Sequence, residues 1–235
     1  MPVTHTRPWN PPSTEPLWQA LVHDTAAAVG VFDSEGVLLW CNALYVHMVG
    51  AERFEQVKGS SIENRIGHEM AVERLPILVD VYRSGKPVMI RDLRRGRALL
   101  LTMRRVEGQP AVILAVWRPA DIPDWADAHV TDVPLAAIKH IDPGPLAALS
   151  EREKEILAFI GQGMTSAQIA KKLCRTIKTI EWHRSAIARK LKTKDRVALA
   201  KLAIQAGLCT PEFNQRLATM EAAEAAGTGA ENNGD

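Results

Sequence analysis

The segment Leu149–Leu208 constrains the fold of this chain more than any other part, because it contains three successive signals for the start of a helix. Each signal is a Ser or Thr whose side-chain oxygen can accept a hydrogen bond from an unpaired backbone amide. In two of them a Glu or Gln three residues later completes a reciprocal capping box. The signals are Ser150 with Glu153, Thr165 with Gln168, and Thr176. They predict a series of short helices, with a break at the glycines of 161–163.

The third predicted helix lies in the most basic part of the chain. Between Lys171 and Lys201 eleven Lys and Arg residues face two acidic residues, so this stretch carries +9. The whole chain carries +2, which leaves −7 on all other residues. A localised positive surface attracts nucleic-acid phosphates, because binding releases the counterions condensed on the duplex. A solvated helix face would show the same charge. Combined with the helix spacing, the charge favours a helix-turn-helix that binds DNA.

Several runs in this segment resemble the LuxR-type helix-turn-helix family. They are Leu149–Leu157, Gly163–Ser166, Gln168–Ala170 and Lys178–Arg184, continuing through Ile187, Lys190-Leu191 and Arg196 to Ala206-Gly207-Leu208. The resemblance covers about a quarter of the chain. It implies a four-helix DNA-binding domain of a transcription regulator. Two residues depart from the family pattern: Lys192 stands where glycine is common, and Arg175 stands where an apolar residue is common.

A helix from Ile177 to Leu191 would have one apolar and one polar face. We expect Ile180, Ile187 and Leu191 to pack on the preceding helices, with His183 near the edge of that face. The packing partners expected there are Ile156, Leu157, Ile160 and Leu173. The opposite face, which would enter a DNA major groove, contains Lys178, Glu181, Trp182, Ser185 and Arg189.

The resemblance directs Glu181, Trp182 and Ser185 toward base edges. Phosphate contacts are expected from Lys178, Thr179, Arg184 and Lys190, and from Thr165 and Ser166 at the amino end of the preceding helix. The full set of predicted DNA-binding residues is Thr165, Ser166, Arg175, Lys178, Thr179, Glu181, Trp182, His183, Arg184, Ser185, Arg189 and Lys190.

Three of these local assignments have an alternative. Glu181 could accept a hydrogen bond from a cytosine amino group, or pair with Arg184 or Ser185 on the helix surface. Trp182 could contact a thymine methyl or a sugar, or fold back over a neighbouring helix. His183 is expected to steady the helix, with a phosphate contact as its alternative. Cys174 is expected to be a small filler on the second helix.

A fourth helix is predicted from about Asp195 to Ala206, ended by Gly207. Its inward face is expected to contain Leu199, Leu202, Ala203 and Ala206. A second apolar strip contains Val197, Ala200 and Ile204, and the family resemblance implies that it forms a homodimer contact. The alternative is that this strip packs under neighbouring side chains. A dimer would bind half-sites about one helical turn of DNA apart.

The segment from Leu17 to Arg118 is predicted to fold as a separate α+β domain with one antiparallel sheet and several helices. The predicted elements are a helical start, a hairpin over Val29–Trp40, helices at Ala43–Val49, Ser60–Ile66 and Met70–Tyr82, and strands at Pro87–Asp92, Arg97–Arg105 and Pro110–Trp117. Pro76 is expected to bend or restart the longest helix, because proline has no backbone N–H to donate.

The run Val31–Gly36, followed by Asn42 and Ser84–Val88, resembles a PAS domain. The resemblance implies a sensory or dimerising domain, and some PAS domains hold a ligand between sheet and helices. Whether this domain holds one stays open, and no cofactor or metal is predicted. His47 and His68 could suggest haem but are expected at the surface. Trp40 and Cys41 are expected in the sheet core, with a pocket position as the alternative.

The composition predicts five regions along the chain. These are a proline-rich disordered start (1–16), the PAS-like domain (17–118), an acidic proline-rich linker (119–146), the helix-turn-helix domain (147–209) and a fraying tail (210–235). Residues 135–140 of the linker are expected to pair or pack locally. The linker's negative charge also suggests that it covers the basic helix when DNA is absent.

The sequence favours a cytoplasmic transcription regulator over two alternatives. No apolar run is long enough to span a membrane, and three widely spaced cysteines suit a reducing compartment. The first alternative is a two-component response regulator with a divergent receiver domain, which would need alternating strands and helices. The second is an enzyme, for which no catalytic motif is found. The expected partners are double-stranded DNA and a second copy of the chain, with RNA polymerase as a further candidate.

Overall fold

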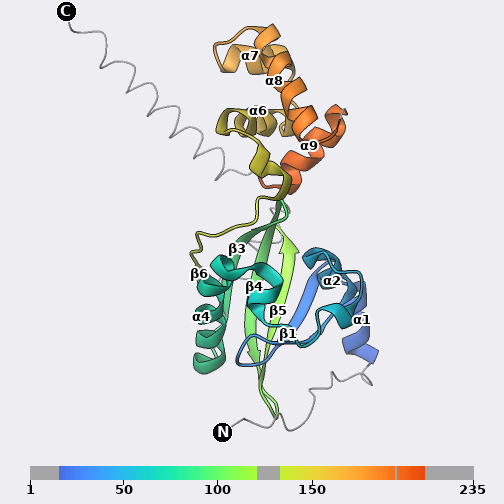
Figure 1. Cartoon of the computed structure of the whole chain (residues 1–235), viewed down its shortest axis with the longest axis vertical. Helices are drawn as coiled ribbons and strands as arrows, with labels where there is room; N and C mark the ends of the chain where they lie inside the picture. The colour runs from blue at the N-terminus through green and yellow to red at the C-terminus, as the bar shows by residue number, and fades with distance from the viewer. Residues whose placement is uncertain (1–15, 121–132, 194, 210–235) are drawn as a thin grey trace, which may run out of the picture. The chain divides into compact units, whose positions relative to one another are not determined.

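The computed structural model describes residues 16–120, 133–193 and 195–209 (Figure 1). These residues divide into two compact units. The first contains the described residues up to Arg94 and from Leu99 to Asp142, and the second contains Arg95–Ala98 and the residues from Pro143 onward. No described helix is long and apolar enough to cross a membrane. The predicted disorder at the amino end, the acidic stretch 121–132 and the tail from 210 lie outside the described residues, except that Pro16 begins the first helix.

The first unit is built on a six-stranded sheet with the strand order β2-β1-β5-β4-β3-β6. Its elements are α1 (Pro16–Asp24), β1 (Ala28–Phe32), β2 (Leu38–Cys41), α2 (Ala43–Val49), the 3-10 helix η1 (Phe54–Gln56), α3 (Ile62–Ile66), α4 (His68–Ser84), β3 (Val88–Arg94), β4 (Arg97–Val106), β5 (Val112–Pro119) and β6 (Leu135–Ala136). Two strands, a group of helices and three strands follow one another as the sequence predicts, so the α+β class is confirmed. The helices α2 and α4 share one apolar core with the sheet, through residues such as Tyr45, Leu78 and Met103.

Asn42 fixes the junction between β2 and α2. Its side-chain oxygen accepts hydrogen bonds from the amides of Val29 and Tyr45, both at 3.0 Å. Its amide nitrogen donates to the carbonyl oxygens of Val22 and Ala27. Because a buried amide is costly unless its polar atoms are paired, this arrangement lets one buried side chain bind α1, β1 and α2 together.

The helix α4 continues through Pro76 as a single helix of 17 residues. The expected restart at this proline is therefore wrong. Pro76 removes one backbone donor from the helix, and Leu78 and Val81 pack the helix against the core.

The sheet is not wholly antiparallel, because β6 pairs in parallel with β3, with Met89 opposite Leu135 and Ile90 opposite Ala136. The strand β6 belongs to a segment that we call the strap, residues 135–142. At its other end the Asp142 amide donates to the carbonyl of Leu93 at 2.8 Å. Residues 135–142, eight of the 28 in the predicted linker, are thus folded onto the first unit, and their pairing is with the distant strand β3 rather than local.

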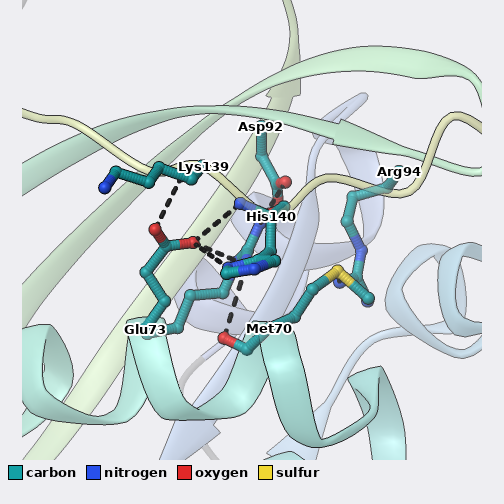
Figure 2. Close-up of polar contacts among 7 residues, drawn as sticks. Met70, Glu73, Asp92, Arg94, Lys139 and His140 are labelled. Carbon is teal, nitrogen blue, oxygen red and sulfur yellow. Dashed lines mark hydrogen bonds and ion pairs between the residues drawn. The ribbon is translucent and has the colours of Figure 1, made fainter.

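Side chains of α4 hold the middle of the strap (Figure 2). The Glu73 carboxylate accepts hydrogen bonds from the backbone amides of Lys139 at 2.7 Å and His140 at 2.9 Å. These bonds lower the pKa of Glu73, since they stabilise the carboxylate form. Arg74 donates to the carbonyl of His140 at 3.0 Å and to the Asp92 carboxylate at 2.6 Å. The strap is therefore fixed to a buried ion pair of the first unit.

The second unit contains the 3-10 helix η2 (Gly144–Ala148) and the helices α6 (Glu151–Gly161), α7 (Ser166–Lys172), α8 (Ile177–Lys190) and α9 (Arg196–Gln205). Ser150, Thr165 and Thr176 cap α6, α7 and α8, with reciprocal capping boxes at the first two, as predicted. Ile180 and Ile187 of α8 are fully buried with Ile156, Leu157, Ile160 and Leu173, and Leu191 packs beside them. The expected inward face of α9 is also buried at Leu199, Ala203 and Ala206.

The described helices α6, α7, α8 and α9 end in the same hydrogen-bond pattern. The residue one past the cap has a positive φ, and the next amide donates back to the carbonyl five residues earlier, as in a Schellman motif. Gly163 and Gly207 occupy the positive-φ position after α6 and α9. Cys174 (φ 50°) and Lys192 (φ 53°) occupy it after α7 and α8. The expectation that Cys174 fills space on α7 is wrong, because α7 ends at Lys172 and Cys174 is exposed in the turn.

Candidate functional site

The outward face of α8 is exposed along its whole length. Lys178, Glu181, Trp182, Ser185 and Arg189 all lie on this face and are all exposed, as the helical spacing predicts. Trp182 has 66% of its surface accessible. Its indole ring meets the His183 imidazole edge-on, with 4.9 Å between the ring centroids. The indole is therefore presented to solvent, which disfavours the alternative that it folds back over another helix.

Glu181 forms a small polar network between α8 and the amino end of α7. The Arg184 guanidinium donates to the Glu181 carboxylate at 2.9 Å and to the Ser166 hydroxyl at 2.8 Å. A hydrogen bond from Ser166, followed by the attraction of Arg184, holds the pKa of Glu181 below its usual range. The helix-surface pair considered for Glu181 is thus present, and Arg184 is engaged inside the domain. Ser185 donates to the Glu181 carbonyl at 2.9 Å.

Lys190 joins the carboxyl end of α8 to the amino end of α6. Its ammonium group lies 2.5 Å from the carboxylate of Glu153, whose side chain is only 6% exposed. The same carboxylate accepts from the Ser150 amide at 2.8 Å. Burial raises the pKa of Glu153, but the Lys190 and Ser150 hydrogen bonds outweigh burial and leave the pKa below its ordinary value. Lys190 was predicted to contact phosphate, and the structure places it in this internal ion pair.

The remaining predicted residues lie around the start of α8. Thr165 and Thr176 accept capping hydrogen bonds, and the Thr179 hydroxyl lies 2.8 Å from that of Thr176. Arg175 is exposed, and its guanidinium donates to the adjacent Cys174 carbonyl. His183 is half-buried, and its Nδ1 has no hydrogen-bond partner among the described residues. These positions place the predicted residues on two neighbouring helices and the turn between them.

Some exposed cations of this region form no ion pair with any other described residue. They are Lys171, Lys178, Arg189, Lys192 and Lys201. Arg196 differs, because its guanidinium donates to the carbonyls of Gly163 and Met164, both at 3.1 Å, and so supports the end of α6. Lys178 and Arg189 are therefore the cations of the outward α8 face that are available to a ligand.

The predicted dimer strip of α9 is only partly exposed. Val197 is 72% exposed and Ile204 is 42% exposed, whereas Ala200 packs against the domain core. The two exposed aliphatic side chains lie seven residues apart, on the same side of the helix.

A second candidate site is a cavity of about 40 Å³ inside the first unit. Most of its walls are apolar, including Phe32, Leu101, Met103 and Trp117. Its charged lining residues are Arg65, Arg74, Asp92 and Arg94, none of which the sequence reasoning selected. The sequence of β3 does contain a pattern that indicates this site. Side chains alternate between the two faces of a strand, so Asp92 and Arg94 lie on the same face as the buried Ile90.

The residues that were considered for a haem or pocket role lie elsewhere. His47 and His68 are exposed, and the His68 imidazole contacts the Glu63 carboxylate at 2.8 Å. Cys41 is buried in the sheet core, where burial raises the pKa of its thiol to about 12. The Trp40 ring packs on Trp18, with 5.8 Å between the ring centroids. Core packing, rather than a place in the cavity, is therefore found for Cys41.

The capped helices, the tight turn after α7 and the exposed basic face of α8 define a helix-turn-helix domain. Residues 147–203 match the GerE family, described as bacterial regulatory proteins of the luxR family. Residues 147–203 of the second unit therefore form a luxR-family helix-turn-helix domain.

One curated relative matches over 62 residues at 42% identity. It is the uncharacterized response regulatory protein YgeK of Escherichia coli strain K12, and the match covers 26% of this chain and 42% of that protein. The chain thus spans less than half of the length of this relative.

Several solved structures are similar at low identity. A VqmA–ligand–DNA complex from Vibrio cholera has 18% identity and a TM-score of 0.39, covering 82% of this chain and 89% of that one. A phage VqmA–DPO complex has 20% identity and a TM-score of 0.40, covering 83% and 91%. The PAS domain of the nitrogen regulation protein NR(II) from Vibrio parahaemolyticus has 18% identity and a TM-score of 0.37, covering 45% and 99%.

Proposed function

We propose that this chain is a transcription regulator that binds double-stranded DNA sequence-specifically through the outward face of α8. The observation that carries the proposal is a capped, solvent-facing basic helix within a luxR-family domain. An exposed helix of this kind fits the major groove, where base edges present a distinct pattern for each base pair. No bond chemistry is needed for this activity.

Within this proposal, the DNA contact assigned to each residue depends on whether its side chain is exposed or already bound inside the domain. Lys178 and Arg189 bind phosphates, because both cations are exposed. Trp182 and Ser185 face the bases, and Glu181 can accept from a cytosine amino group once Arg184 turns toward a phosphate. Ser166, at the start of α7, lies at the same network. Lys190 acts mainly by holding α8 against α6.

The proposed domain order is a PAS-like sensory unit up to the strap, followed by the DNA-binding domain from Pro143. The described strands and helices of the first unit do not alternate, which speaks against the receiver domain of a response regulator. Val197 and Ile204 supply an exposed apolar contact for a homodimer, and a dimer would recognise two half-sites about one helical turn apart. RNA polymerase stays a candidate partner.

The test is selection of bound duplexes from a random pool by the purified full-length protein at low salt. We expect an enriched motif, with two half-sites if the protein binds as a dimer. Trp182→Ala should abolish the enrichment while the circular dichroism spectrum stays unchanged, because the indole makes no core contact. Absence of any retained duplex at low salt would contradict the proposal.

A further inference from the structure

The cavity of the first unit contains an excess of buried positive charge. Three arginines line it against a single carboxylate, that of Asp92, which is already bound by Arg74 at 2.6 Å. Arg65 is held by the carbonyl oxygen of Gly36 at 2.8 Å and lies over the Phe32 ring. Arg65 and Arg94 are thus left without an ion pair among the described residues, and of the two only Arg65 has oxygen acceptors.

Arg94 is buried, and among the described residues no carboxylate lies within hydrogen-bond distance of its guanidinium. Only 7% of its surface is exposed, and the one hydrogen-bonding neighbour found for its guanidinium in the described part of the chain is the Met70 thioether sulfur at 3.5 Å. Sulfur is a weak acceptor, whereas a guanidinium carries five N–H donors. Burial lowers the pKa of Arg94 and the neighbouring Arg74 adds to this effect, while Asp92, Tyr45 and Asp142 oppose it without cancelling it. A buried cation in this state is unfavourable unless an anion compensates it.

The geometry points to a small organic monocarboxylate as the missing partner, and we propose that the cavity is its binding site. A carboxylate pairs with a guanidinium through two parallel hydrogen bonds, the strongest arrangement available to arginine. The apolar walls formed by Leu101, Met103 and Trp117 would accept a short hydrocarbon part. A cavity volume of about 40 Å³ restricts the ligand to a small molecule.

This inference rests on the proposed sensory function of the first unit and gives that function a chemical class of signal. It also assigns a route for the signal. Arg94 and the Arg74–Asp92 pair interact electrostatically, and Arg74 holds the strap through the His140 carbonyl. A carboxylate bound at Arg94 changes the charge beside this pair, so occupancy is sensed where the strap is attached.

The test is calorimetric titration and thermal unfolding of the full-length protein, prepared in buffer free of carboxylates, with propionate as the probe. Propionamide, which has the same shape without the charge, and inorganic phosphate, which has no apolar part, are the control ligands. We expect saturable binding and a raised midpoint temperature with propionate alone.

The decisive variant is Arg94→Met. It should lose propionate binding while its unliganded midpoint temperature stays equal to or above that of the wild type, because a poorly compensated buried charge is removed. Arg94→Lys keeps the charge without the planar fork and should weaken binding about tenfold. Arg104→Met, at an exposed arginine of the adjacent strand β4, should bind propionate as the wild type does.

Three results would overturn the inference. The first is that the wild type does not bind propionate at millimolar concentrations. The second is that Arg94→Met binds propionate as tightly as the wild type does. The third is that both Arg94 variants are unfolded, which would show that Arg94 has a structural role. Phosphate binding without propionate binding would also reject a carboxylate ligand. The same preparations are also tested for retention of duplex DNA. If they retain DNA but do not bind propionate, the carboxylate inference fails and the proposed DNA-binding function does not.

Discussion

The two units of this protein differ in what they bury. The core of the second unit is almost entirely aliphatic, and its two buried acids, Glu153 and Glu155, bind the surface cations Lys190 and Arg152. The first unit buries the charged residues Arg74, Asp92 and Arg94 in its interior. Both units therefore bury charged groups, but the buried acids of the second unit pair with partly exposed cations, whereas Arg74 and Asp92 of the first unit are buried together.

This difference indicates where each unit carries its function. An ion pair in a protein interior contributes little net stability, because the desolvation of both charges offsets their attraction. The buried charges of the first unit are thus poorly explained by folding and better explained by a site. In the second unit the apolar core packs against the inner face of α8, and the outward face is left exposed.

The largest effect should follow from breaking the buried pair of the first unit. Asp92→Ala leaves the Arg74 guanidinium, 5% exposed, without its carboxylate, and should lower the free energy of unfolding by about 3–5 kcal/mol. The double variant Arg74→Met/Asp92→Leu should recover most of this loss. Urea denaturation measures both values. A loss below about 1 kcal/mol for the single variant would show that the pair is not buried as described.

A nearly equal effect should follow from a cavity in the second unit. Ile180 is fully buried on the inner side of α8, so Ile180→Ala should lower the free energy of unfolding by about 3 kcal/mol. Trp182→Ala, two residues away on the exposed side, should change it by less than about 0.5 kcal/mol. Urea denaturation reports on the inner face of α8, and retention of duplex DNA reports on its outward face. Equal destabilisation by both substitutions would contradict the orientation of α8.

A smaller effect should come from the Glu153–Lys190 pair, and it depends on pH. The pKa of Glu153 is lowered in the folded state, so the stabilisation is complete above its ordinary pKa of 4.5 and is lost as the pH falls through the folded value. Glu153→Gln should remove about 1–2 kcal/mol at neutral pH and flatten this acid dependence. Thermal unfolding between neutral and acidic pH tests the prediction. Glu151→Gln, at an exposed neighbouring acid, serves as the control.

The smallest effect should be a gain of stability at the helix ends. Cys174 and Lys192 both adopt a positive φ, which glycine tolerates better than any residue with a Cβ atom. Cys174→Gly and Lys192→Gly should each stabilise the second unit by up to about 1 kcal/mol. The cysteine variant separates the backbone effect from the removal of a cation. A loss of stability in both variants would show that the side chains make compensating contacts.

Much of this architecture could be predicted from the sequence because its signals are local. The caps Ser150, Thr165 and Thr176 act within one helical turn, and the apolar spacing of α8 reports directly on its buried face. For the same reason the helix Ala43–Val49 is found with its predicted bounds.

The features that could not be predicted depend on contacts between distant residues. The strand β6 has only two residues, too few to show an alternation, and its partner β3 lies more than forty residues earlier in the chain. Glu73 and Arg74 resemble ordinary charges on an amphipathic helix until the strap covers them. Lys190 similarly resembles a free cation, because its partner Glu153 lies 37 residues away.

The most direct test of the account is the salt dependence of DNA affinity, measured by fluorescence anisotropy on a selected duplex with the wild type, Lys178→Ala and Lys86→Ala. Lys86 is an exposed lysine of the first unit and serves as the matched control. Between about 50 and 200 mM salt, Lys178→Ala should bind more weakly and reduce the slope of log affinity against log salt by about one unit, while Lys86→Ala matches the wild type. An unchanged slope and affinity for Lys178→Ala would contradict the claim that the outward face of α8 binds the duplex.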